Sequence, residues 1–244
     1  GGKTPGGSMT NVLWTVELPS HAEAGRGPNA KWACVDAAGQ APSPRYCHSA
    51  ERLSKGWLIF GGWAEGRRRN AEERQLNEQG AQPFLCDLHL FAFDTMSWAT
   101  LECKGSVPRG RCQAVMVSSH DEEIILIFGG ACHHDPQPGQ VYGDMVMDLY
   151  DVALLHLPTL TWLPATGMPS HYPQRGGTNA LLRIPGGGCF IFGGMNSDAG
   201  SDMPNFLNEM TQIIGLNADE SNGERPGIHS TSPELAAATG TDGC

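Results

Sequence analysis

The sequence has few basic residues, with 16 Lys and Arg against 26 Asp and Glu, and its formal net charge is -10 over 244 residues. Nucleic acids and anionic membranes attract proteins through basic surfaces, so this balance argues against both as general partners. No apolar run reaches the roughly 20 residues that a membrane-spanning helix needs. We therefore expect no nucleic acid and no membrane among the partners.

The sequence also lacks ordered cysteine motifs. Its eight cysteines include no CxxC pair and no dense framework, and no Asn-x-Ser/Thr glycosylation site occurs. A chain of this size does not depend on disulfides to hold its core. These absences favour reduced thiols and a cytoplasmic location, with the nucleus as the alternative.

Glycine and proline, by contrast, are abundant, and 32 Gly with 17 Pro favour many short elements joined by turns. Three glycine doublets each close a short apolar run of Leu, Ile and Phe, namely Gly61-Gly62, Gly129-Gly130 and Gly193-Gly194. A fourth doublet, Gly1-Gly2, opens the chain. A phrase that recurs at a long period indicates a repeat protein.

Two further residue types share this period. Successive copies are 66 and 64 positions apart, both for Trp32, Trp98 and Trp162 and for Arg45, Arg111 and Arg175. The repeat is therefore marked by doublet, tryptophan and arginine independently.

Each complete repeat predicts a four-stranded antiparallel meander, because apolar stretches alternate with turn residues. In residues 45–103 the expected strands are 46–53, 57–60, 87–93 and 98–102. In residues 111–165 they are 112–118, 124–128, 151–157 and 162–164. Asp87 and Asp151 each precede the tryptophan of their repeat by 11 residues.

Partial repeats stand at both ends. Residues 1–36 hold the second half of a unit, with strands at 13–18 and 32–35, and residues 175–216 hold three strands of another, at 177–183, 189–192 and 210–214. Residues 217–244 have almost no large apolar side chains, so we expect a disordered tail there. Because the chain opens inside the repeated phrase and without Met, we expect a fragment of a longer protein whose N-terminus is missing.

Doublet, aromatic residue and tryptophan in four-stranded units resemble the kelch repeat of β-propellers, over roughly residues 1–216. The resemblance implies an all-β, kelch-type β-propeller, of which this chain supplies a partial ring of four-stranded antiparallel blades. The repeats are longer than the family's period of about 50 residues, and the extra length lies between strands two and three. We expect the doublets and tryptophans to build the frame and to contact no ligand.

Two whole units and parts of two others cannot close a ring of roughly 4 to 8 blades. A longer single chain would close it. Alternatively, two copies would complete each other's sheets, since one end supplies the later strands of a unit and the other end the earlier ones. We expect a monomeric full-length propeller rather than a ring completed by two chains.

Function is expected on the face that carries the connections between strands two and three together with the loops at the junctions between blades. The connections there, 63–85, 131–150 and 195–208, are long, and long loops on a rigid frame commonly bind partners. The candidate partner-binding residues are Arg45, Arg111, Arg175, Arg109, His133 and His134. For the three periodic arginines the alternative is a salt bridge or carbonyl contact that holds the junction between units.

The leading hypothesis is a non-catalytic scaffold that binds a protein or peptide, and the alternative is a metal-dependent kelch enzyme of oxidase or specifier type. The resemblance implies defined metal ligands for such enzymes, and the sequence does not supply the set. Asp144 and Asp148 are four apart, but His156 falls at eight. Cys132, His133 and His134 are adjacent and cannot all face one ion. We predict no catalytic residue, no metal and no cofactor.

Overall fold

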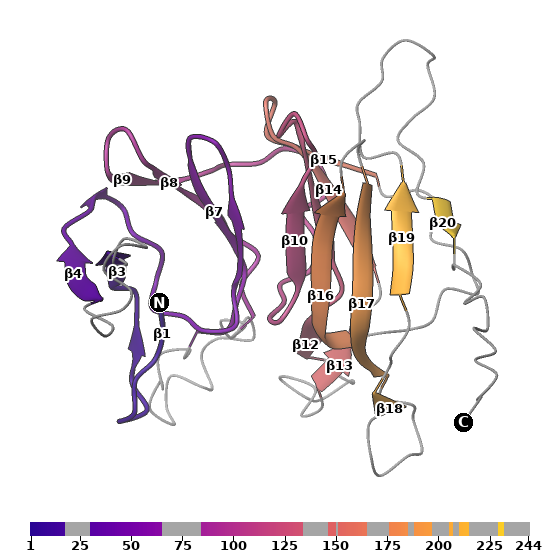
Figure 1. Ribbon diagram of the computed structural model, residues 1–244, viewed down its shortest axis with the longest axis horizontal. Helices are drawn as coiled ribbons and strands as arrows, with labels where there is room; N and C mark the ends of the chain where they lie inside the picture. Colours follow the sequence, from indigo (N-terminus) through magenta and orange to yellow (C-terminus); the bar gives the residue numbers. More distant parts are fainter. Residues whose placement is uncertain are drawn as a thin grey trace, which may run out of the picture.

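The computed structural model describes residues 1–17, 30–64, 84–133, 146–149, 151–164, 176–184, 188–196, 205–206, 210–214 and 229–231. These residues form a succession of mainly antiparallel sheets that follow one another along the molecule (Figure 1). Within these ranges there is no helix long and apolar enough to cross a membrane. The expected all-β fold of four-stranded antiparallel sheets is confirmed.

The second unit, residues 45–103, forms one meander in which each strand pairs with the next. Its strands are β6 (Ser49–Arg52), β7 (Gly56–Phe60), β8 (Leu88–Ala92) and β9 (Ser97–Thr100). Leu53 N–H donates to the Gly56 carbonyl at 2.8 Å and closes the tight turn between β6 and β7. The strand order follows the sequence pattern. β6 and β8 are shorter than expected, whereas β7 and β9 each begin one residue earlier than expected.

The third unit, residues 111–165, repeats this meander. Its strands are β10 (Val115–Ser118), β11 (Ile124–Phe128), β14 (Val152–His156) and β15 (Thr161–Leu163). Between β11 and β14 the chain adds a small hairpin, β12 (Ala131–His133) with β13 (Val146–Asp148). The insertion thus carries strands of its own.

The first unit, residues 1–36, contributes a hairpin of two strands. They are β3 (Leu13–Glu17) and β4 (Lys31–Val35), preceded by the short pair β1 (Gly2–Lys3) and β2 (Met9–Thr10). Trp32 of β4 pairs with Val16, as Trp98 pairs with Phe91 in the second unit. These two strands are therefore strands three and four of the first unit.

The fourth unit differs from the expectation. Its sheet contains β16 (Gly176–Ile184), β17 (Gly188–Asn196), β19 (Met210–Ile214) and β20 (His229–Thr231), with β18 (Asn205–Phe206) beside the end of β17. No strand was expected after residue 214, yet β20 pairs with β19. Ser230 stands opposite Ile213, the position that tryptophan takes in the other units, so the sequence signal for strand four is absent. A fourth unit with its own fourth strand also removes one premise of the two-copy ring.

The glycine doublets directly follow strand two in the second and third units, and the doublet of the fourth unit lies within β17. In Gly61, Gly129 and Gly193 φ is 63°, 63° and 74°, which only glycine adopts readily, and the second glycine of each doublet also has a positive φ. A Cβ on Gly61 would lie 2.7 Å from the Arg111 carbonyl oxygen of the next unit. The doublets therefore build the frame as expected.

The segments that link the units run along the outside of the next sheet. β5 (Ala38–Gly39) pairs in parallel with β9, and Lys104 forms a parallel bridge with Thr161 of β15. Gly39 and Gly105 are 66 positions apart and have φ of 78° and 85°. A Cβ on either would lie under 3 Å from the carbonyl oxygen of Trp98 or Trp162. These two glycines belong to the repeat and were not recognised in the sequence.

The core lies between successive sheets. One cluster joins the third and fourth units through Phe128 and Ile191, and a second joins the second and third units through Phe60 and Trp162, whose rings are 5.8 Å apart. A third, smaller cluster packs Trp98 of the second unit against residues of the first. The buried tryptophans therefore separate adjacent sheets, as expected.

Candidate partner-binding face and unit junctions

Arg45 is buried at the start of the second unit, where it holds three segments together. Its guanidinium forms a bidentate pair with Asp87, at 2.6 and 2.8 Å. It also donates to the Gly61 carbonyl at 2.9 Å and to the carbonyl and hydroxyl oxygens of Ser43. These five bonds use all five N–H donors of the side chain.

Arg111 repeats the arrangement in the third unit. It is 1% exposed and pairs with Asp151 at 2.6 and 2.9 Å. It donates to the Gly129 carbonyl at 3.1 Å and to the Arg109 carbonyl at 2.9 Å. Each arginine therefore ties the glycine doublet to the start of strand three within its unit.

The second unit adds a histidine to this network. His89 Nε2 lies 2.8 Å from the Asp87 carboxylate, and its Nδ1 lies 3.3 Å from the Thr100 hydroxyl. Burial raises the pKa of the Asp87 carboxyl, but the bonds from Arg45 and His89 outweigh it and hold that pKa well below its ordinary value. Asp87 is therefore an anion at neutral pH.

This geometry favours the junction alternative for Arg45 and Arg111. Arg45 is buried, and oxygen atoms of the chain itself accept hydrogen bonds from all of its N–H donors. It therefore has no donor left for a partner. Asp87 and Asp151 were not expected to be the partners of these arginines. Their shared spacing of 11 residues before tryptophan was the available signal.

The other candidates are only partly placed. Arg109 is half-buried in the segment that leads into the third unit, and its carbonyl accepts the bond from Arg111. His133 ends β12, and only its backbone position is described. Arg175 and His134 lie outside the described residues. Their roles in partner binding stay predictions.

Short antiparallel pairings follow the glycine doublets in all four units. They are β1 with β2, Trp63 with Phe84, β12 with β13, and the end of β17 with β18. β1, β12, β13 and β18 lie at the same end of the molecule (Figure 1). We call this end, defined by the four pairings, the hairpin face. The connections expected there as irregular loops thus begin as regular extensions of the sheets.

An apolar cluster supports the hairpin face between the second and third units. Phe84, Cys132 and Leu149 are buried in it, with Trp63 packed against them. Tyr46 and Trp63 exchange backbone hydrogen bonds of 3.0 and 2.9 Å, and their rings are 5.1 Å apart. Packing therefore fixes the base of the hairpin face between the second and third units.

The Cys112 thiol, which packs against this cluster, is a poor metal ligand and nucleophile at neutral pH. Burial raises the pKa of Cys112 to about 11, and the neighbouring Cys47 and Cys132 thiols add to the effect. In the described part of the chain no three His, Cys, Asp or Glu side chains gather into a group that could hold a metal ion.

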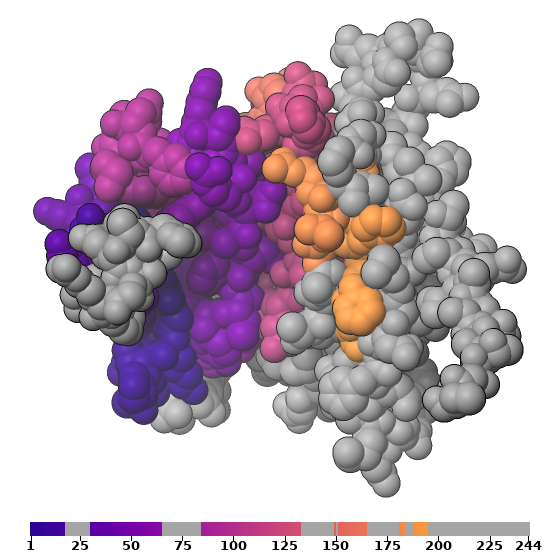
Figure 2. Space-filling view, viewed as in Figure 1, coloured from indigo at the N-terminus to yellow at the C-terminus, as the bar shows by residue number. Residues whose placement is uncertain are grey.

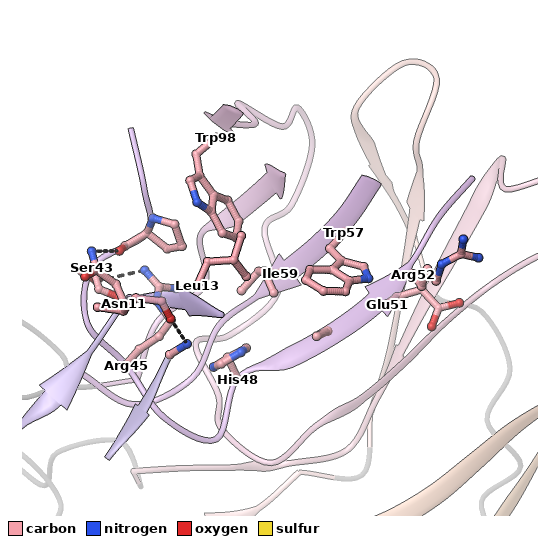
Figure 3. A pocket seen from close by; sticks show the side chains of 14 residues that line it. Asn11, Leu13, Ser43, Arg45, His48, Glu51, Arg52, Trp57, Ile59 and Trp98 are labelled. Atoms are coloured by element: carbon pink, nitrogen blue, oxygen red, sulfur yellow. Dashed lines mark hydrogen bonds between the residues drawn. The ribbon is translucent and has the colours of Figure 1, made fainter. Parts of the chain in front are cut away.

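One cavity of about 350 Å³ lies between the first and second units. Leu13, Trp57, Ile59 and Trp98 give it apolar walls (Figure 3). Glu51 and Arg52 lie at one end, and Asn11 and Ser43 lie at the other. The sequence did not indicate this cavity, because its walls come from distant segments of two units.

The family of the chain follows from comparison with known proteins. Residues 1–194 match the family described as the KLHDC2/KLHL20/DRC7 Kelch-repeats domain. The chain belongs to this kelch family. Kelch domain-containing protein 3 of Homo sapiens is 30% identical over 204 residues, which cover 81% of this kelch chain and 44% of that protein.

Another relative and a solved structure are also similar to this chain. Acyl-CoA-binding domain-containing protein 5 of Arabidopsis thaliana is 28% identical over 180 residues, 74% of this chain and 23% of that protein. The chain thus spans less than half the length of these curated relatives. The solved structure of YjhT superposes with a TM-score of 0.54 at 14% identity, over 93% of this chain and 60% of that one, and shares the fold.

Proposed function

We propose that this kelch domain is a non-catalytic interaction scaffold that binds a protein or peptide segment on its hairpin face. The observation that carries the proposal is the repetition of a short antiparallel pairing after the glycine doublet in all four units. Variable connections on such a rigid base are the usual place of binding in repeat proteins.

The contacts at the unit junctions support a rigid frame beneath the binding face. Arg45 and Arg111 donate hydrogen bonds to residues of the frame, and the apolar cluster that includes Trp63 fixes the base of the hairpin face. The excess of acidic residues favours a protein partner over nucleic acid or an anionic membrane.

The proposal is tested by site-specific photo-crosslinking to a purified partner. A photoreactive residue at Thr4, in the turn between β1 and β2, or at Ala64, next to the Trp63 pairing, reports on the hairpin face. Lys55 and Asp94 are exposed in turns at the opposite ends of the strands and serve as controls. We expect partner adducts from Thr4 and Ala64 alone. Adducts from Lys55 or Asp94 in equal yield would contradict the proposed face.

A further inference from the structure

Two half-buried cysteines lie next to each other at the junction between the second and third units. Cys47 stands just before β6, the inner strand of the second unit, and Cys112 just before β10, the inner strand of the third. Gln113 N–H donates to the Cys47 carbonyl at 2.8 Å. With standard backbone dimensions, this bond keeps the Cα atoms of Cys47 and Cys112 within about 7.6 Å. Disulfides span Cα separations of about 4.4 to 6.8 Å, so a small shift at most allows a bond.

The sulfur atoms of the two cysteines are also close. Burial and, after it, the Cys47 thiol raise the pKa of Cys112 to about 11. Cys132 acts on Cys112 in the same direction but less strongly. The interaction between two charges weakens with distance, so Cys47 is a near neighbour of the Cys112 sulfur. Both cysteines carry free thiols.

The repeat fixes the backbone on both sides of this pair. Cys112 exchanges hydrogen bonds of 2.9 and 2.8 Å with Ala131. Cys47 and Gln113 hold equivalent positions in their units, 66 apart, and share a positive φ of 54° and 56°. Residues other than glycine adopt this conformation rarely, and here it recurs at the entry to the inner strand. A bond between Cys47 and Cys112 therefore forms on a frame that is already in place.

The order in which the two thiols react follows from their surroundings. The thiolate is the nucleophile in thiol–disulfide exchange, and burial holds Cys112 in its protonated form at neutral pH. The first attack on an external disulfide thus falls to Cys47. Cys112 acts second, within the protein, where its closeness to Cys47 offsets its low thiolate fraction.

We propose that Cys47 is a site of reversible modification by small-molecule disulfides such as oxidised glutathione, and that Cys112 converts the modified thiol into a disulfide between the two units. The Cys47 thiolate attacks one sulfur of oxidised glutathione, forms a mixed disulfide and releases one glutathione thiolate. Cys112 then loses its proton to solvent and attacks the Cys47 sulfur, and the second glutathione leaves. Two protein thiols are oxidised, and one glutathione disulfide is reduced to two thiols.

The disulfide joins two complete units at the entries to their inner strands. Cys47 and Cys112 are 65 positions apart, and a cross-link that closes a long loop restricts the unfolded chain strongly. Oxidation should therefore stabilise the junction, and reduction should release it. This redox site does not depend on partner binding at the hairpin face.

Peptide mapping identifies the bond directly. The protein is incubated with oxidised glutathione, its remaining thiols are blocked with N-ethylmaleimide, and it is digested with trypsin and a glutamate-specific protease. Cleavage after Arg45, Glu51, Arg111 and Glu122 places Cys47 on residues 46–51 and Cys112 on residues 112–122, apart from Cys132. We expect mass spectrometry to detect these two peptides linked, and dithiothreitol to separate them.

Other products of the same digest decide against the proposal. Glutathione that stays on Cys47 without any cross-link would show that Cys112 does not resolve it. A bond from Cys112 to Cys132, or one between two protein molecules, would also overturn the proposal, because neither joins the second unit to the third within one chain.

Thermal unfolding with three serine variants measures the effect on stability. We expect oxidised glutathione to raise the thermal midpoint of the wild type by at least about 4 °C, and dithiothreitol to reverse the rise. Cys47→Ser and Cys112→Ser should not respond, whereas Cys34→Ser, at an exposed position of β4, should respond like the wild type. Midpoints in dithiothreitol show whether each variant folds, and a rise that persists in Cys47→Ser would contradict the assigned site.

Discussion

Ile59 and Ile127 occupy the same position in neighbouring units, one residue before the end of strand two, and their surroundings differ. Ile127 lies in the junction between the second and third units and is 0% exposed. Ile59 lies in the junction between the first and second units, is 8% exposed and borders the cavity. The sheets of the second and third units are alike, so the difference in exposure comes from the unit that packs against each of them.

The sheets of this protein are therefore stabilised by the inner strands of the unit before them. Leu53, Leu58 and Phe60 of the second unit cover the third, whereas the first unit offers β3 and β4 alone in the described residues. In a repeat protein the interface between units contributes much of the stability. A matched pair of residues across the two junctions measures that contribution.

Replacing the matched isoleucines should give the largest effect. Ile127→Ala should lower the free energy of unfolding by about 4 kcal/mol, because it opens a void in a filled junction. Ile59→Ala should cost about 2 kcal/mol, because the cavity already borders that side chain. Urea unfolding followed by circular dichroism measures both, with wild type as reference. An equal loss for the two variants would mean that the first junction is as well packed as the second.

Removing the carboxylate that faces a buried arginine should have the next largest effect. Asp87→Asn leaves the Arg45 guanidinium without its anion and should cost about 1 to 3 kcal/mol, at the lower end because Asp87 is partly exposed to solvent. Asp151→Asn, the equivalent change beside Arg111, should behave alike. Urea midpoints at pH 7 measure both effects, and a neutral result would assign the anchoring to the carbonyl contacts alone.

The same pair predicts the acid dependence of stability. The folded pKa of Asp87 lies below its ordinary value of 3.8, so the contribution of the ion pair is fully present above that pH. It is lost as the pH falls from about 4 through the folded pKa. Urea midpoints between pH 7 and pH 3 should therefore fall less steeply for Asp87→Asn than for the wild type. Parallel curves would show that this carboxylate does not drive the acid loss.

The units, the strand order and the role of the doublets could be predicted because each depends on local sequence. A glycine doublet after an apolar run indicates the end of a strand, and a tryptophan after a turn indicates the start of the next one. In both cases the signal and the structure lie in the same residues. Strand four of the fourth unit could not be predicted, because Ser230 stands at the position that tryptophan takes in the other units. The sequence of β20 therefore carries no marker of the repeat.

The contacts at the unit junctions could not be predicted, because they join distant residues. Arg45 and Asp87 are 42 positions apart, and the sequence alone could not separate a junction arginine from a partner-binding one. The cavity depends on the whole first junction, and no single residue announces it. The long connections indicated the hairpin face. Its regular pairings could not be predicted, because they extend the sheets and depend on how the strands before them are paired.

Substitutions in the glycine doublets should destabilise the protein less than the changes above. The loss should again be larger in a complete unit than in the first unit. Gly130→Ala places a Cβ 2.6 Å from the Cys112 carbonyl oxygen at a φ of 98°, and should cost about 2 kcal/mol. Gly2→Ala meets no atom within 4 Å, and should cost about 1 kcal/mol from its positive φ alone. Thermal unfolding compares the two. A larger drop in the thermal midpoint for Gly2→Ala than for Gly130→Ala would contradict the expectation that the doublet of the complete unit contributes more to stability.

The smallest effect is expected at the tryptophan of the first unit. Trp32 is 67% exposed, whereas Trp162, in the same position of the third unit, is 5% exposed beside Phe60. Trp32→Ala should therefore change the free energy of unfolding by less than about 0.5 kcal/mol, since an exposed side chain has little packing to lose. Acrylamide should also quench a larger part of the fluorescence in the wild type than in this variant. A loss above about 2 kcal/mol would show that Trp32 is covered in solution, as the buried tryptophans of the later units are.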